Sequence, residues 1–145
     1  MKNSLAVIKT PFVGHTNCRK RILVIENDVE LRHILSLIFD DEGYDYQMYN
    51  DTFDIVPLAK HYQPDLVLLD FRLSLVNGGE LCLQLKNEPQ TGAIPVIIYS
   101  AAPRAFLSVR DYKHDFFLPK PFDLEELLSK IRELTFINML KVKSS

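Results

Sequence analysis

The chain has little of what marks several large classes of protein. It contains only two cysteines, Cys18 and Cys82, far apart and without a CxxC spacing, so neither a disulfide framework nor a zinc site is expected. The chain also lacks a large excess of positive or negative residues, because it has 17 Lys and Arg and 19 Asp and Glu. The formal charge of −2 gives no global attraction to nucleic acid or anionic lipid. These absences favour a cytoplasmic protein without direct nucleic-acid or membrane partners.

Long hydrophobic runs are absent as well. The first apolar stretch, residues 5–8, is cut off by Lys9, Thr10 and Pro11 and is too short for a signal peptide. No later segment reaches bilayer length without charges. No glycine-rich loop follows the apolar run of residues 21–25, which argues against a P-loop nucleotide site. With 47% hydrophobic and 25% charged residues, the 145-residue chain has the composition of one globular domain.

From residue 21 onward, short apolar runs alternate with stretches of helical periodicity. This alternation is typical of βαβ units around a parallel sheet, and therefore of an α/β fold. Five runs predict strands, at residues 21–25, 45–49, 66–70, 95–100 and 116–118. The second run is the most polar and is expected at an edge. We predict one domain over residues 21–137, with an extension of residues 1–20 before it and a tail of residues 138–145 after it.

Two helices are predicted by the spacing of their apolar residues. Between residues 31 and 39 these recur at intervals of three and four, and Gly43 ends the helix. A last helix begins after Asp123, which can form a capping box with Glu126. Its buried face is expected to consist of Leu124, Leu127, Leu128, Ile131 and Leu134.

Two other helices are less clearly marked. Pro57 lies within residues 52–62, so that helix is either short, with Pro57 in its first turn, or bent. Residues 101–116 leave room for only about three helical turns.

Asp70 directly follows the apolar run of residues 66–69, which places a carboxylate at the carboxyl end of a buried strand. Open α/β sheets bind ligands beyond such ends. If the first and third strands are neighbours, Glu26 and Asn27 come to lie beside Asp70, and these oxygen donors suit Mg²⁺. Asn27 or Asp28 can instead cap the following helix, which we favour for Asp28. Taken alone, Glu26 would be a solvated carboxylate at a strand end.

Two further polar residues fall at strand ends. Lys120 follows the fifth predicted strand, and Ser100 ends the fourth. A cation and a hydroxyl facing a carboxylate and a metal describe a site for a phosphoryl group carried on Asp70. Each residue alone is a weak signal, because lysine between prolines and serine at a strand end are both common in loops and turns. The inference rests on their joint spacing.

Four segments, in order, resemble those of response-regulator receiver domains. They are residues 21–28 (RILVIEND), 64–70 (PDLVLLD), 95–101 (PVIIYSA) and 118–122 (LPKPF). The resemblance extends from residue 21 to about residue 137. It implies a flavodoxin-like fold, in which one doubly wound parallel sheet of strand order 2-1-3-4-5 carries helices on both faces.

The resemblance also implies a function for the acidic residues. Asp70 would accept a phosphoryl group from a histidine kinase or a phosphotransfer protein. Mg²⁺ would be held near Glu26, Asn27, Asp70 and the backbone carbonyl of Arg72. Lys120 would pair with the phosphorylated aspartate.

A switch and an output face follow from the same resemblance. Ser100 would bond the phosphoryl group on activation, and Phe117 would occupy the aromatic switch position. A downstream protein would bind the face formed by the fourth helix, the fifth strand and the last helix. The protein is expected to be a stand-alone receiver and not an enzyme.

The two departures from the family pattern that bear most on the site are at Asn27 and Arg72. Asn27 stands where a second carboxylate is usual, which predicts weaker Mg²⁺ binding and favours the alternative of an adaptor that binds partners without phosphorylation. Arg72, two residues past Asp70, could hold phosphoryl oxygens and partly replace the metal charge, or it could simply face solvent. An aspartyl phosphohydrolase would want an acid at position 72, so this class is disfavoured.

Overall fold

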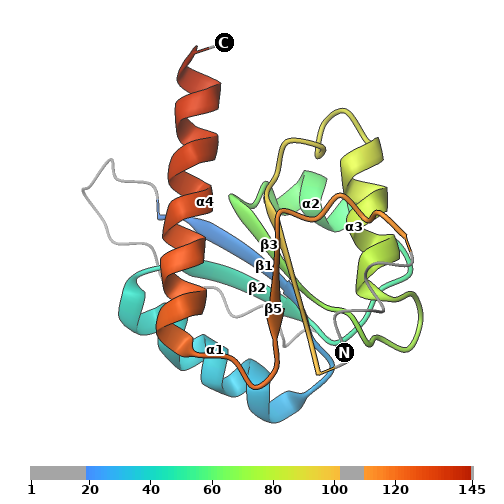
Figure 1. Ribbon diagram of the computed structural model, residues 1–145, viewed down its shortest axis with the longest axis vertical. Coiled ribbons are helices and arrows are strands. Elements are labelled where there is room, and N and C mark those ends of the chain that lie inside the picture. The colour runs from blue at the N-terminus through green and yellow to red at the C-terminus, as the bar shows by residue number, and fades with distance from the viewer. Residues whose placement is uncertain (1–18, 102–109, 145) are drawn as a thin grey trace.

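The computed structural model describes residues 19–101 and 110–144 (Figure 1). The predicted extension of residues 1–20, apart from its last two residues, lies outside this part. Residues 102–109 of the region 101–116, where another helix was predicted, also lie outside it, and residues 110–115 are not helical. The elements alternate along the chain as β1 (Arg21–Ile25), α1 (Val29–Glu42), β2 (Asp45–Tyr49), α2 (Val56–Tyr62), β3 (Leu66–Asp70), α3 (Gly78–Asn87), β4 (Val96–Ser100), β5 (Phe116–Pro119) and α4 (Leu124–Ser144).

The strands form one parallel sheet in the order β2-β1-β3-β4-β5. Helices α1 and α4 pack on one face, where their apolar side chains join one core cluster. Helices α2 and α3 pack on the other face over a second cluster. This confirms the predicted α/β fold and its strand order. β3 is central and buried along its whole length, so its end lies between two flanking strands.

The strand bounds agree closely with the prediction. β1, β2 and β3 have the predicted residues, and β2 lies at an edge of the sheet with alternating burial. β4 begins at Val96, one residue later than predicted, and Pro95 contributes only its carbonyl oxygen, which accepts a bond from Val67 N at 3.0 Å. β5 extends one residue further, to Pro119.

Helix α1 begins and ends as its sequence predicts. The Asp28 side chain accepts hydrogen bonds from the backbone nitrogens of Glu30 at 2.9 Å and Leu31 at 3.3 Å, which confirms it as the N-cap. Gly43 ends the helix with φ of 80°, the left-handed conformation that favours glycine. Helix α2 is the short alternative, with Pro57 in its first turn.

Helix α4 differs from the prediction in two ways. Leu124 is 40% exposed, although it was expected on the buried face, because it lies at the first residue of the helix and beside a surface groove. The helix also continues through residues 138–144, which were expected to form a tail and contain no proline or glycine to stop it. Figure 1 shows this end projecting beyond the sheet. No helix in the described part of the chain is long and apolar enough to span a bilayer.

Candidate functional site

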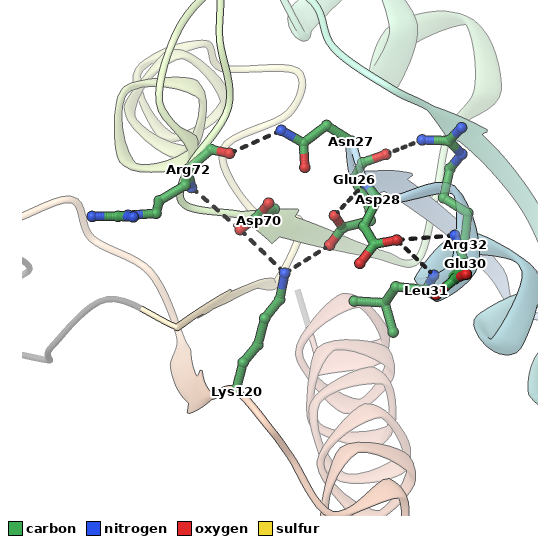
Figure 2. A network of polar contacts seen from close by, with 9 residues as sticks. All are labelled: Glu26, Asn27, Asp28, Glu30, Leu31, Arg32, Asp70, Arg72 and Lys120. Carbon is green, nitrogen blue, oxygen red and sulfur yellow. Dashed lines mark hydrogen bonds and ion pairs between the residues drawn. The ribbon is translucent and has the colours of Figure 1, made fainter.

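Three charged side chains meet where β1, β3 and β5 end (Figure 2). The Lys120 ammonium lies 3.1 Å from Oε1 of Glu26 and 3.5 Å from Oδ1 of Asp70. Glu26 is 0% exposed and Asp70 is 4% exposed. Because the strands are parallel, residues that follow different strands reach the same edge of the sheet. The structure thus brings together residues that are 94 positions apart.

Glu26 is fixed by the backbone around it. Its Oε2 accepts a hydrogen bond from the Asp28 backbone nitrogen at 2.8 Å, and its own nitrogen donates to the Tyr49 carbonyl at 2.9 Å. The buried guanidinium of Arg32, on α1, donates to its carbonyl oxygen. Glu26 is therefore not a solvated carboxylate. Arg32 was not anticipated, although a charged residue three positions before Leu35, within the apolar face of a helix, was a usable signal.

The carboxyl group of Asp70 has a raised pKa. Burial and the negative charge of Glu26 raise its pKa from 3.8 to about 6, while Lys120 and the Arg72 backbone N–H act in the opposite direction. The Arg72 nitrogen donates to Oδ1 of Asp70 at 3.2 Å. At neutral pH the group is still mainly ionised, so it can act as a nucleophile beside an ammonium group.

The loop between β3 and α3 is held by polar contacts from several elements. Oδ2 of Asp51, which follows β2, accepts hydrogen bonds from the backbone nitrogens of Ser74 at 3.0 Å and Leu75 at 3.2 Å. A Cβ on Gly78 would lie 2.3 Å from the Asp70 carbonyl oxygen, so only glycine fits there without displacing the backbone. The sequence did not single out Asp51, and its position after the edge strand is the only signal it offered.

Ser100 and Phe117 occupy the two strands beyond β3. Ser100 ends β4 and is 2% exposed, and its carbonyl accepts a hydrogen bond from the Lys120 backbone nitrogen at 2.8 Å. Phe117, on β5, is 6% exposed and belongs to the core cluster on the α2 and α3 side. Both residues are therefore buried in the strands on the Lys120 side of β3.

Asn27 and Arg72 form the outer side of the site. The Asn27 Nδ2 donates a hydrogen bond to the Arg72 carbonyl oxygen at 3.2 Å (Figure 2). This carbonyl is the predicted backbone ligand of Mg²⁺, and the Asn27 amide uses one of its two lone pairs. The Arg72 side chain is exposed and points away from Asp70 in Figure 2. Its placement corresponds to the solvent-facing alternative.

The donor set fits a hard cation in its chemistry. Glu26 and Asp70 offer carboxylates, Asn27 an amide oxygen and Arg72 a carbonyl, all oxygen ligands of the kind Mg²⁺ prefers. No group of three or more acidic, histidine or cysteine side chains placed to hold a metal occurs among the described residues. Glu26, Asn27, Asp70 and the Arg72 carbonyl would hold the ion, and Asn27 would contribute its amide oxygen while its nitrogen bonds the Arg72 carbonyl in this structure.

Comparison with known proteins agrees with this arrangement. Residues 22–132 match the family model of the response regulator receiver domain. The chain is 34% identical over 116 residues to the DNA-binding dual master transcriptional regulator RpaA of Synechocystis, and 34% identical over 116 residues to the response regulator ArlR of Staphylococcus aureus. Each alignment covers 79% of this chain but only 48% and 52% of the relative. The chain thus spans about half the length of these relatives.

Solved structures show the same fold. The signal receiver domain of a histidine kinase from Syntrophus aciditrophicus has a TM-score of 0.73 at 26% identity, covering 80% of this chain and 89% of that one. A receiver domain from Vibrio parahaemolyticus has a TM-score of 0.76 at 21% identity, covering 88% and 98%. With the matched family model, these findings show that the chain belongs to the response regulator receiver domain family.

Proposed function

We propose that this receiver is a phosphorylation switch in which Asp70 accepts a phosphoryl group from a histidine kinase or a phosphotransfer protein. The observation that carries the proposal is the Lys120 ammonium, which lies within 3.5 Å of both Asp70 and Glu26. An oxygen of Asp70 forms a bond to phosphorus while the bond from phosphorus to the donor histidine nitrogen breaks, and that electron pair stays on the imidazole. The protein is a phosphoacceptor and not an enzyme acting on a separate substrate.

The other residues of the cluster have complementary roles. Lys120 neutralises charge as the phosphoryl group arrives, and can then pair with its oxygens. β4 ends in Ser100, which is proposed to bond the phosphoryl group, and β5 carries Phe117, which is proposed to change its packing in response. β4, whose carboxyl end lies beside Asp70, and its neighbour β5 can therefore carry the change to the surface.

Receiver domains generally bind Mg²⁺ at the phosphorylation site, and Glu26, Asn27, Asp70 and the Arg72 carbonyl would hold it here. When bound, the ion supplies positive charge that offsets the charge of the phosphoryl oxygens. Because Asn27 adds no negative charge and already bonds the Arg72 carbonyl, we infer weaker binding than with a carboxylate at this position.

The phosphodonor is proposed to cover an apolar groove beside the site. The groove has a volume of about 520 Å³, and Lys120 forms part of it. Its other lining residues are Leu31, Ile34, Ala101, Pro121, Phe122 and Leu124. A donor histidine that reaches Asp70 must lie over this edge of the sheet, so apolar side chains of a helix that bears the histidine would contact the groove.

The output is proposed to pass to a protein through the face formed by β5, α4 and the region of residues 101–116, of which residues 102–109 lie outside the described part of the chain. Exposed Phe136, Ile137 and Leu140 on α4 offer apolar contact area for such a partner. The Synechocystis relative is a DNA-binding regulator, and output to DNA would need a module beyond the receiver fold. We favour a receiver that acts through a protein partner, since the net charge of −2 gives no attraction to DNA.

One experiment separates the switch from the adaptor alternative that Asn27 favours. The protein is incubated with Mg²⁺ and a small phosphodonor, and its mass is measured with Asp70→Ala as the control. The switch requires the mass of one phosphoryl group to be gained by the wild type and not by the variant. A wild type that gains no mass would contradict the switch and favour the adaptor, which binds its partners without phosphorylation.

A further inference from the structure

Tyr99 lies next to the charged cluster. It precedes Ser100 on β4, pairs with Asp70 in the register of β3 and β4, and is 0% exposed. Its side chain belongs to the core cluster on the α1 and α4 side. The Lys120 ammonium lies over its ring, 4.7 Å from the centroid. The Tyr99 ring therefore contacts the Lys120 ammonium, the positive charge of the cluster.

The ring itself is held in place. Phe122, in the segment between β5 and α4, meets Tyr99 edge to face, with ring centroids 5.7 Å apart and an angle of 87° between the planes. Edge-to-face pairs of this kind are favourable, because the positive edge of one ring meets the negative face of the other. The face that Tyr99 turns to Lys120 is thus a fixed surface.

A fixed ring face matters for a lysine more than for most residues. The ammonium sits on a flexible four-carbon stem, and holding it in one geometry costs side-chain entropy. Its two carboxylate partners compete for it, and Glu26 is the nearer at 3.1 Å against 3.5 Å for Asp70. An aromatic face attracts the ammonium without competing for its protons, so it can keep the cation between the two carboxylates.

We propose that Tyr99 is a positioning residue whose ring holds the Lys120 ammonium beside Asp70 for phosphoryl transfer. The role is assigned to the ring, because the Lys120 ammonium lies over the ring and not beside the hydroxyl. The kinetic part of this inference rests on the proposed function of Asp70. The geometric part, that the ring sets the position of Lys120, stands independently of it.

The test compares Tyr99→Leu with Tyr99→Phe. Protons above an aromatic face are shifted upfield in the NMR spectrum, so the ε-methylene protons of Lys120, assigned by their loss in Lys120→Ala, should be upfield in the wild type and in Tyr99→Phe. They should return to ordinary lysine values in Tyr99→Leu. The initial phosphorylation rate with a small phosphodonor should fall roughly three- to tenfold in Tyr99→Leu, and less than about twofold in Tyr99→Phe. If Tyr99→Leu does not fold, Tyr99→Met takes its place.

Tyr46→Leu is the matched control. Tyr46 is a tyrosine of the same core cluster, 2% exposed, but it lies on the edge strand β2 and its hydroxyl donates to Asp40 at 3.0 Å. This variant should lose stability yet keep both the Lys120 shift and the rate. An equal fall in rate for both leucine variants, or Lys120 protons at ordinary values in the wild type, would overturn the proposal. A wild type that takes no phosphoryl group refutes the proposed function alone, since the Lys120 shift still decides the role of Tyr99.

Discussion

The two sides of the site are built differently. On the inner side, Glu26, Lys120 and Asp70 form a buried charged cluster between three strands. On the outer side, the exposed Asn27 amide bonds the Arg72 carbonyl, and no charge is involved. The inner side has the groups needed to receive a phosphoryl group, whereas the outer side has a hydrogen bond at an oxygen that a metal would use. The difference between the two sides is the basis for the proposed phosphoacceptor role of Asp70 and for the proposed weak binding of Mg²⁺.

The largest effect is expected from removing the cation of the inner side. Lys120→Met leaves two buried carboxylates without their ammonium partner, and should lower the free energy of unfolding by about 2–3 kcal/mol at pH 7.5. Lys130 is a matched control, because it also lies 3.1 Å from a carboxylate, that of Glu133, which is half exposed. Lys130→Met should cost less than about 1 kcal/mol. Urea denaturation measures both, and equal losses would mean that burial of the carboxylates is unimportant.

The second prediction concerns the pKa of Asp70, which burial and Glu26 raise from 3.8 to about 6. The folded state then binds a proton more tightly than the unfolded state, so stability falls as pH rises from about 4 to about 6 and stays lower above that. Asp70→Asn removes the buried carboxylate and the cost of ionising it. The variant should be more stable than the wild type by about 1–2 kcal/mol at pH 7.5. The difference should shrink toward pH 4.

Denaturation at several pH values, with a chelator present, tests this prediction. A difference between Asp70→Asn and the wild type that is constant from pH 4 to 7.5 would show that Asp70 does not titrate as its surroundings require.

The third prediction converts the outer side into a charged one. Without metal, Asn27→Asp replaces the amide donor with a carboxylate facing the Arg72 carbonyl, which should cost about 1 kcal/mol of stability. With Mg²⁺ the sign reverses, because the added charge should tighten binding about tenfold. Calorimetric titration and thermal melts with and without Mg²⁺ follow both effects.

Asn77→Asp is the matched control for Asn27→Asp. The Asn77 side chain accepts a hydrogen bond from the Glu80 backbone nitrogen at 2.9 Å, a role that a carboxylate also fills. Neither Mg²⁺ affinity nor metal-free stability should fall in this control. Unchanged Mg²⁺ affinity in Asn27→Asp would show that the outer side is not the metal position.

The smallest effect is expected at Arg72, whose side chain is exposed and points away from Asp70. Arg72→Ala should change the phosphorylation rate and the phosphoaspartate lifetime by less than about twofold, because a solvent-facing guanidinium adds little to the field at the site. Both are measured with a small phosphodonor. A larger fall in the rate or the lifetime would mean that the Arg72 side chain turns toward Asp70 and partly replaces the charge of the metal. The outer side would then also act on the phosphoryl group.

The sequence was sufficient to predict those features that depend only on neighbouring residues. An unbroken apolar run ending in Asp70 placed β3 and its carboxylate, and Asp28 and Gly43 marked the ends of α1 because capping depends on neighbouring residues only. The same reasoning failed at Leu124. Its spacing fits the apolar stripe of α4, but whether the first turn reaches the sheet depends on how the helix docks.

What the sequence determined by itself was the α/β fold, the residues at the strand ends and the absence of a carboxylate at position 27. The tertiary structure decided which of these groups touch. It placed Lys120 over the Tyr99 ring and between two carboxylates, turned the Asn27 amide to the Arg72 carbonyl, and pointed the Arg72 side chain away. The reason is physical: periodicity and capping act within a few residues, whereas the electrostatics of the site depend on distances between strands far apart in the sequence.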